Sequence, residues 1–178
     1  MKNLFLLLIL FNTILLTTSY SQNSGSGMPT DLSLGYGALH GGLGGKLTLN
    51  NVVYVGLGAL TGKTLWEAGL QFPFRINEMR NSGKLINTGY LAVGYGGIGV
   101  KTDFYWDSYG NFETATKAIN GWTLLAGYLF VIGSDDRLFL DLGAGYSFGK
   151  TKFFEGTDFE TDVKFNAYTI DGGIGYRF

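Results

Sequence analysis

Residues able to perform acid–base or nucleophilic chemistry are sparse in this chain. It contains one histidine, His40, and no cysteine. Acid–base catalysis most often uses a histidine, whereas disulfides, thiolate chemistry and many transition-metal sites need cysteine. The only adjacent carboxylates, Asp135 and Asp136, fall in a short polar stretch that indicates a turn. The sequence therefore predicts no cofactor and no transition-metal site, and it leaves His40 as the one candidate catalytic side chain.

Two weaker patterns suggest ion or phosphate binding. Asp107, Asn111 and Glu113 could supply oxygen ligands to Ca²⁺, but a solvated turn explains them equally well. Residues 41–46, 96–101 and 172–177 repeat a pattern of two glycines, an aliphatic residue, a glycine, any residue and a cation. A phosphate-binding glycine loop needs a following helix, and no helical periodicity follows. We interpret the repeat as a strand device, with the aliphatic residue facing outward and the cation ending an inner row.

Charged residues of both signs share the parity of small residues when the chain is divided into strands. They are Lys46, Glu67, Arg75, Lys101, Asp141, Asp171 and Arg177. In a narrow barrel these side chains would face an interior that they nearly fill, and an unpaired buried charge costs several kcal/mol. The mixture of signs predicts a salt-bridged, plugged lumen. A narrow, gated conduction path is the alternative.

Alternating apolar and polar residues predict the strands that would position these charges. Strands are expected over residues 52–60, 64–76, 85–106, 113–132, 137–154 and 159–178. Residues 32–49 form either one long bulged strand or a hairpin that turns near His40, because the parity of the leucines changes there. The hairpin gives eight strands and the bulge seven; bacterial single-chain barrels have even numbers, which favours eight.

Aromatic residues concentrate near strand ends, mostly on the face opposite the charges. They are Trp66, Phe72, Phe74, Tyr90, Tyr105, Trp106, Trp122, Tyr128, Phe130, Tyr146, Phe148, Tyr168, Tyr176 and Phe178. A soluble ligand-carrying barrel would turn such residues inward, whereas Trp and Tyr suit the membrane–water interface. Since no later stretch is long and apolar enough for a membrane helix, insertion would require closed strands. The expected fold is an all-β, antiparallel up-and-down transmembrane barrel.

The N-terminal segment indicates export. Lys2 precedes an apolar run of about 13 residues, shorter than the ~20 that span a bilayer, and Ser19 and Ser21 fit a cleavage site before Gln22. We therefore expect a signal peptide at residues 1–21, a flexible lead-in at 22–30 and a barrel at 31–178. The near balance of 13 Lys and Arg against 14 Asp and Glu excludes a nucleic-acid binder driven by phosphate neutralisation.

The leader, the alternating strands and the terminal Tyr176-Arg177-Phe178 resemble the small bacterial outer-membrane β-barrel proteins, including the opacity-like and porin-like families. The resemblance implies a monomer in the outer membrane of a Gram-negative cell envelope, in contact with its lipid. It also implies insertion by the barrel-assembly machinery, which would read Tyr176 and Phe178 as an assembly signal. A structural or surface-interaction role is the expected function. The alternatives are a small porin for ions or minor solutes, and a lipid hydrolase or acyltransferase that uses His40.

Overall fold

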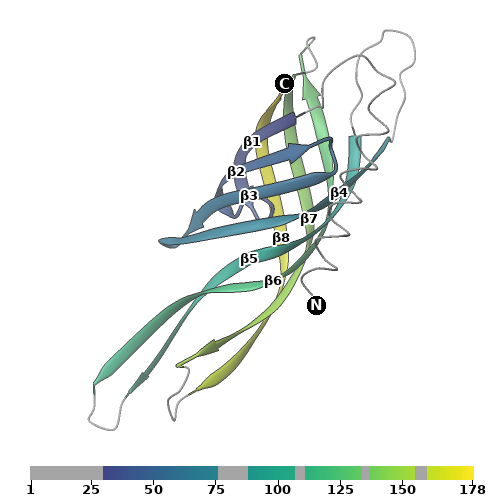
Figure 1. Cartoon of the computed structure of the whole chain (residues 1–178). Coiled ribbons are helices and arrows are strands. Elements are labelled where there is room, and N and C mark those ends of the chain that lie inside the picture. Colours follow the sequence, from purple (N-terminus) through teal and green to yellow (C-terminus); the bar gives the residue numbers. More distant parts are fainter. Residues whose placement is uncertain (1–29, 76–87, 107–110, 134–136, 155–159) are drawn as a thin grey trace, which may run out of the picture.

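Eight antiparallel strands close into one barrel in chain order (Figure 1). The computed structural model describes residues 30–75, 88–106, 111–133, 137–154 and 160–178. The strands are β1 (Thr30–Gly37), β2 (Gly42–Leu49), β3 (Val53–Leu60), β4 (Lys63–Arg75), β5 (Thr88–Trp106), β6 (Phe112–Ile132), β7 (Leu138–Phe153) and β8 (Thr161–Arg177). The predicted eight-strand, up-and-down fold is confirmed, and residues 32–49 form the hairpin rather than the bulged strand. The expected signal peptide, like lead-in residues 22–29, lies outside the described part of the chain.

Strand length divides the molecule into a closed barrel and two projecting ribbons. β1, β2 and β3 have 8 residues each, whereas β5 has 19 and β6 has 21. The β6–β7 ladder runs only as far as the pair Gly121–Gly149. Beyond it, the hairpins β5–β6 and β7–β8 extend separately, away from the end of the barrel where the C-terminus lies (Figure 1). Within the ribbons, Ile119 and Phe153 are fully buried.

A β-bulge in β5 marks the start of this projection. The register with β6 shifts between Gly97 and Gly99, so the inward parity changes from even to odd residues. Ile98 is the extra residue of the bulge, without a register partner on β6, and its side chain lies on the inner side, where it would overlap a Cβ atom placed on Gly121. The prediction that the aliphatic residue of each glycine repeat faces outward is therefore wrong for Ile98. It holds for Leu43 and Ile174, which are exposed.

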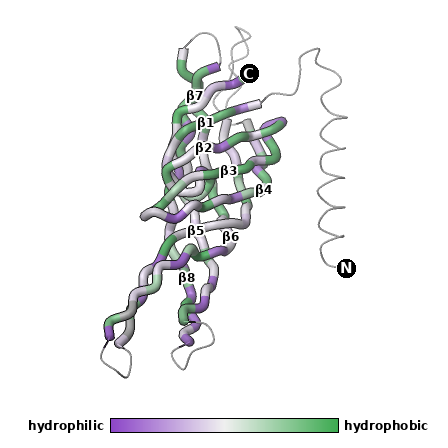
Figure 2. The backbone as a smooth tube through the Cα atoms, turned by 60° about the vertical axis from the view of Figure 1, so that its left-hand side comes forward, coloured by the Kyte–Doolittle hydropathy of each residue, from purple (hydrophilic) through white to green (hydrophobic). Residues whose placement is uncertain are grey.

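Outward apolar residues alternate with polar or small inward residues along strands such as β1 and β7, because successive side chains point to opposite faces (Figure 2). Outward-facing residues form continuous rows across the ladders, such as Tyr95 beside Trp122 and Trp122 beside Phe148. Among the described residues, no helix is long and apolar enough to span a bilayer.

Inward-facing glycines make room for large side chains in the lumen. A Cβ atom on Gly127 would overlap the Tyr90 ring, and one on Gly175 would overlap the Phe139 ring. Tyr90 and Phe139 belong to the buried core, together with Leu39, Tyr54, Ala92, Leu125 and Leu129. The glycine content is thus explained by close packing inside a narrow barrel.

Candidate functional site in the barrel lumen

An ion pair crosses the centre of the lumen. The Lys46 ammonium on β2 donates to Asp141 Oδ2 on β7, two strands that are not neighbours in the barrel. The Tyr90 hydroxyl on β5 donates to Asp141 Oδ1 over 2.6 Å, and Lys46 Nζ lies 5.5 Å from the centroid of the Tyr90 ring. All three side chains are buried. The pairing therefore compensates two buried charges and ties three strands together.

Glu67 on β4 forms a second buried polar cluster. The Tyr54 hydroxyl donates to Glu67 Oε1 over 2.9 Å, and Thr123 Oγ1 lies 3.4 Å from Glu67 Oε2. Thr123 also shares a 3.1 Å hydrogen bond with Ser147. Hydroxyl groups on β3 and β6, rather than a directly paired cation, thus satisfy this carboxylate.

The β1–β2 turn folds into the lumen and carries the chain's histidine with it. His40 Nδ1 lies 3.1 Å from Asp171 Oδ1, and His40 Nε2 lies 3.0 Å from Ser33 Oγ. The backbone N–H of Leu39 donates to the same Asp171 oxygen over 2.9 Å. Leu39 and His40 have no exposed surface. The turn therefore fills the end of the lumen at which β1 ends and β2 begins, and Asp171 on β8 holds the turn in place.

Ser33, His40 and Asp171 have the order of contacts that a serine nucleophile, its general base and an orienting carboxylate would need. Catalysis also needs space for a substrate beside the serine oxygen, together with donors for a developing oxyanion. Ser33 is 1% exposed, and a Cβ atom on Gly173 would already stand 2.8 Å from His40 Nε2. Packed backbone thus occupies the space around the imidazole.

A second ion pair lies at the end of the barrel where β1 begins and β8 ends. Arg177 on β8 donates from Nε and Nη2 to the two oxygens of Asp31 on β1, each over 2.7 Å. The guanidinium also donates to Asn51 Oδ1 over 3.3 Å and stands 5.9 Å from the Phe139 ring centroid. Asp31 and Arg177 are direct register partners, so this bidentate pair fastens the seam where the last strand meets the first.

The structure places five of the seven charges assigned to the lumen inside or at the rim of the barrel. They are Lys46, Glu67, Asp141, Asp171 and Arg177. The prediction that Lys101 faces the lumen is wrong, because Lys101 is exposed. Gly96 is the last residue of β5 that pairs with β4, and beyond it β5 continues into the projecting ribbon. The Arg75 side chain lies outside the described part of the structure.

Several lumen residues escaped the sequence analysis. Tyr90 was grouped with the outward aromatics but is fully buried, and Tyr54, Ser33 and Asp31 received no role. Parity could have found both tyrosines: Tyr90 alternates with the outward Leu91, and Tyr54 lies between outward valines. The pairing of His40 with β8 has no local signal, because it depends on barrel closure.

Within the residues that the structure describes, no three His, Cys, Asp or Glu side chains group as metal ligands would. Comparison of the chain with protein-family models, with curated proteins and with solved structures finds no match. The geometry of the site is that of a lumen lined by buried side chains, in which Lys46 pairs with Asp141. Hydroxyl groups hold Glu67, and a backbone N–H and the His40 imidazole hold Asp171.

Proposed function

We propose that this chain is a monomeric outer-membrane β-barrel protein with a structural or surface-interaction role, and that its lumen is plugged. The inverted distribution of residues carries the proposal: the outer face of the barrel is apolar and the interior is charged. A water-soluble barrel would bury its apolar face and expose its charges.

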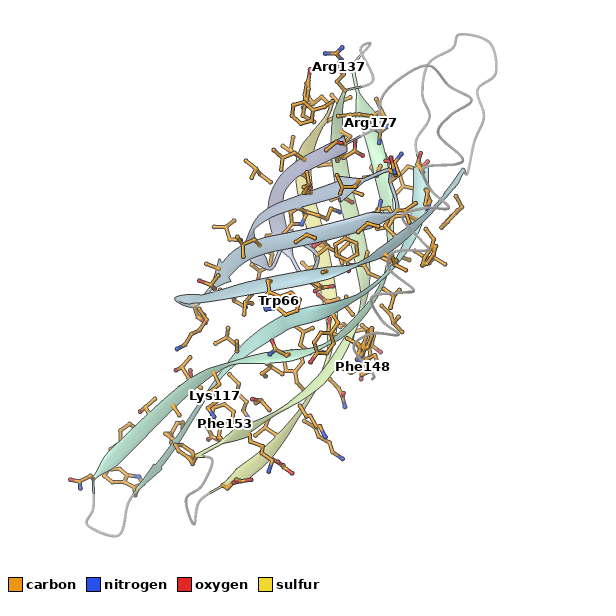
Figure 3. All side chains as sticks on the ribbon, in the orientation of Figure 1. Trp66, Lys117, Arg137, Phe148, Phe153 and Arg177 are labelled. Carbon is orange, nitrogen blue, oxygen red and sulfur yellow. The ribbon has the colours of Figure 1, made fainter. Side chains whose placement is uncertain are left out.

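The outer face supports contact with hydrocarbon. Leu34 is 69% exposed, Leu57 61% and Ile174 58%, and they belong to a band that extends around the barrel. Soluble monomers rarely expose apolar patches beyond a few hundred Å². The Tyr95 ring makes edge-on contacts with Trp66 at 6.4 Å and with Trp122 at 5.3 Å between centroids, in a row typical of a membrane–water interface. Trp66, labelled on β4 in Figure 3, is exposed.

The lumen contacts favour a plug over the small-porin alternative. Ions need a continuous hydrated path, yet Tyr54, Tyr90, Leu39 and His40 have no exposed surface. The cation and the carboxylate that cross the lumen are engaged with each other, so they offer no free charge to a passing ion. The buried contacts of His40 with Ser33 and Asp171 likewise favour a structural role for the histidine over lipid modification.

Refolding into detergent and then into planar bilayers tests the proposal. We expect a far-ultraviolet circular dichroism spectrum dominated by β-structure, and a difference in gel migration between unheated and heated samples. We expect no reproducible conductance steps across a range of voltages. A water-soluble protein that does not insert would refute the membrane assignment. Regular conductance steps from the inserted protein would refute the plug and favour the porin.

A further inference from the structure

Two lysines face outward on β7 and β8 immediately beyond the aromatic row. Along this hairpin the register runs from Tyr146–Tyr168 to Phe148–Asn166 and then to Lys150–Lys164. Both lysines are exposed and share the parity of the apolar outer face. If the aromatic row marks the edge of the hydrocarbon, the two ammonium groups stand at the level of lipid headgroups.

The two lysines are direct cross-strand partners, an arrangement that is destabilising for like charges. The nearby acids belong to another cation: Lys152 pairs with Glu160 and lies 4.0 Å from Asp162. Across the described residues, no carboxylate pairs with Lys150 or Lys164. Directly opposed Cβ atoms stand about 5 Å apart, so two flexible ammonium groups can converge on one anion. The pair therefore has the charge and spacing to hold a phosphate.

An apolar groove lies on the same outer face, toward the middle of the barrel. The residues that line it include Leu124, Ala126, Ala144, Gly145, Tyr146 and Tyr168. The path along β7 from Ala144 to Lys150 is about 20 Å at ~3.3 Å per residue. With a strand tilt of about 40°, its component along the barrel axis is about 15 Å, half of a ~30 Å hydrocarbon core. The groove and the lysines thus span roughly one leaflet.

We propose that this face binds a phosphorylated membrane lipid, with its phosphate between Lys150 and Lys164 and an acyl chain in the groove. The proposal rests on the membrane insertion proposed above. The positive pair and the apolar groove together match a lipid anion; free phosphate would use the lysines alone and leave the groove empty.

Tryptophan quenching by brominated lipids measures this preference directly. The protein carries Trp106→Phe, so that only Trp66 and Trp122, near the aromatic row, report. It is refolded into vesicles that mix brominated phosphatidylglycerol with unbrominated phosphatidylcholine, and into vesicles with the bromine on the other lipid. The test variant is Lys150→Gln/Lys164→Gln. The control, Lys63→Gln/Lys101→Gln, removes two exposed lysines from the same end of the molecule and keeps the net charge equal.

We expect the protein that keeps both lysines and the control variant to favour the anionic lipid roughly 30-fold, from two lysines near a membrane surface. The double glutamine variant should show no more than a twofold preference. High salt should weaken the preference of the control as well. Ala144→Phe should fill the groove and reduce the preference, and free phosphate at millimolar concentration should not compete.

Equal quenching by both lipids in the protein with intact lysines would overturn the proposal, as would equal losses in the test and control variants. Competition by free phosphate with no effect of Ala144→Phe would show an anion site without an acyl site, and would also overturn it. Quenching by brominated phosphatidylcholine reports insertion itself. Its absence would refute the membrane assignment rather than the lipid preference.

Discussion

Replacing Lys46 by Met should destabilise the barrel far more than the loss of an ordinary ion pair. Lys46 is 2% exposed and Asp141 is fully buried, so the substitution leaves a carboxylate in the lumen with only the Tyr90 hydroxyl as a donor. Breaking a buried pair from one side costs about 3–5 kcal/mol. We expect the free energy of unfolding to fall by about that amount. The matched control is Lys152→Gln, which breaks a pair whose side chains are 52% and 36% exposed and should cost less than ~1 kcal/mol.

The double variant Lys46→Met/Asp141→Asn distinguishes the energy of the ion pair from the energy lost with the other contacts of these side chains. Asn keeps an acceptor for the Tyr90 hydroxyl while removing the charge, so the double variant has no uncompensated ion. Asp141→Asn alone leaves a buried cation and should also cost about 3–5 kcal/mol. The two single losses should therefore not add: we expect the double variant to lose only about 1–2 kcal/mol.

Urea unfolding from phospholipid vesicles, followed by tryptophan fluorescence and by gel migration of unheated samples, measures these differences. Two results would refute the reasoning. One is a loss below ~1 kcal/mol for Lys46→Met, which would mean that water solvates the lumen. The other is additivity of the two single substitutions, which would mean that Lys46 and Asp141 are not energetically coupled.

Two further substitutions, one of them with a control, and one truncation test other parts of the barrel. Gly127→Ala should lower the unfolding free energy by about 1–3 kcal/mol because its methyl group overlaps the Tyr90 ring, whereas Gly45→Ala, with its nearest neighbours at 3.5 Å, should change it little; urea unfolding compares them. His40→Ala should destabilise the barrel by about 1–3 kcal/mol and leave the lipid profile of cells unchanged, whereas altered lipid turnover would favour the enzyme alternative. Removing Phe178 should preserve refolding in detergent but reduce outer-membrane abundance in cells; unchanged abundance would argue against an assembly signal.

The period of two in the sequence predicted which residues face in and out because that alternation is a local steric property of a strand. It placed Trp66 and Trp122 outside and Asp141 and Asp171 inside, as the structure has them. The parity change near His40 left seven or eight strands open, and the even strand number of bacterial barrels favoured eight. Parity needs no knowledge of which strands are neighbours, so it works on a single sequence.

Parity does not encode how far along the barrel a residue lies or which other residues its side chain contacts. Lys101 keeps an inner parity after the bulge, beside Lys117, yet it is exposed because β5 outlasts its neighbour β4. Tyr90 was assigned by residue type, as an interfacial aromatic, against its own alternation with Leu91. The contact of His40 with Asp171 joins residues 131 positions apart, and only closure of the barrel brings them together.

Polar contacts fasten both ends of the seam where β1 meets β8. β1 and β8 meet over only the register from Asp31–Arg177 to Gly37–Asp171, after the longest chain closure in the barrel. The bidentate pair fastens one end of this short ladder, and Asp171 holds the inward turn at the other. A slip of one residue would turn these side chains to the outer face and leave them unpaired, in contact with hydrocarbon if the barrel inserts as proposed.

The backbone N–H of Phe178 donates to the Thr30 carbonyl at the same seam, so the predicted assembly signal ends where closure is completed. We infer that Asp31, Arg177 and Asp171 specify the closing register of the barrel, a role that requires no transported solute.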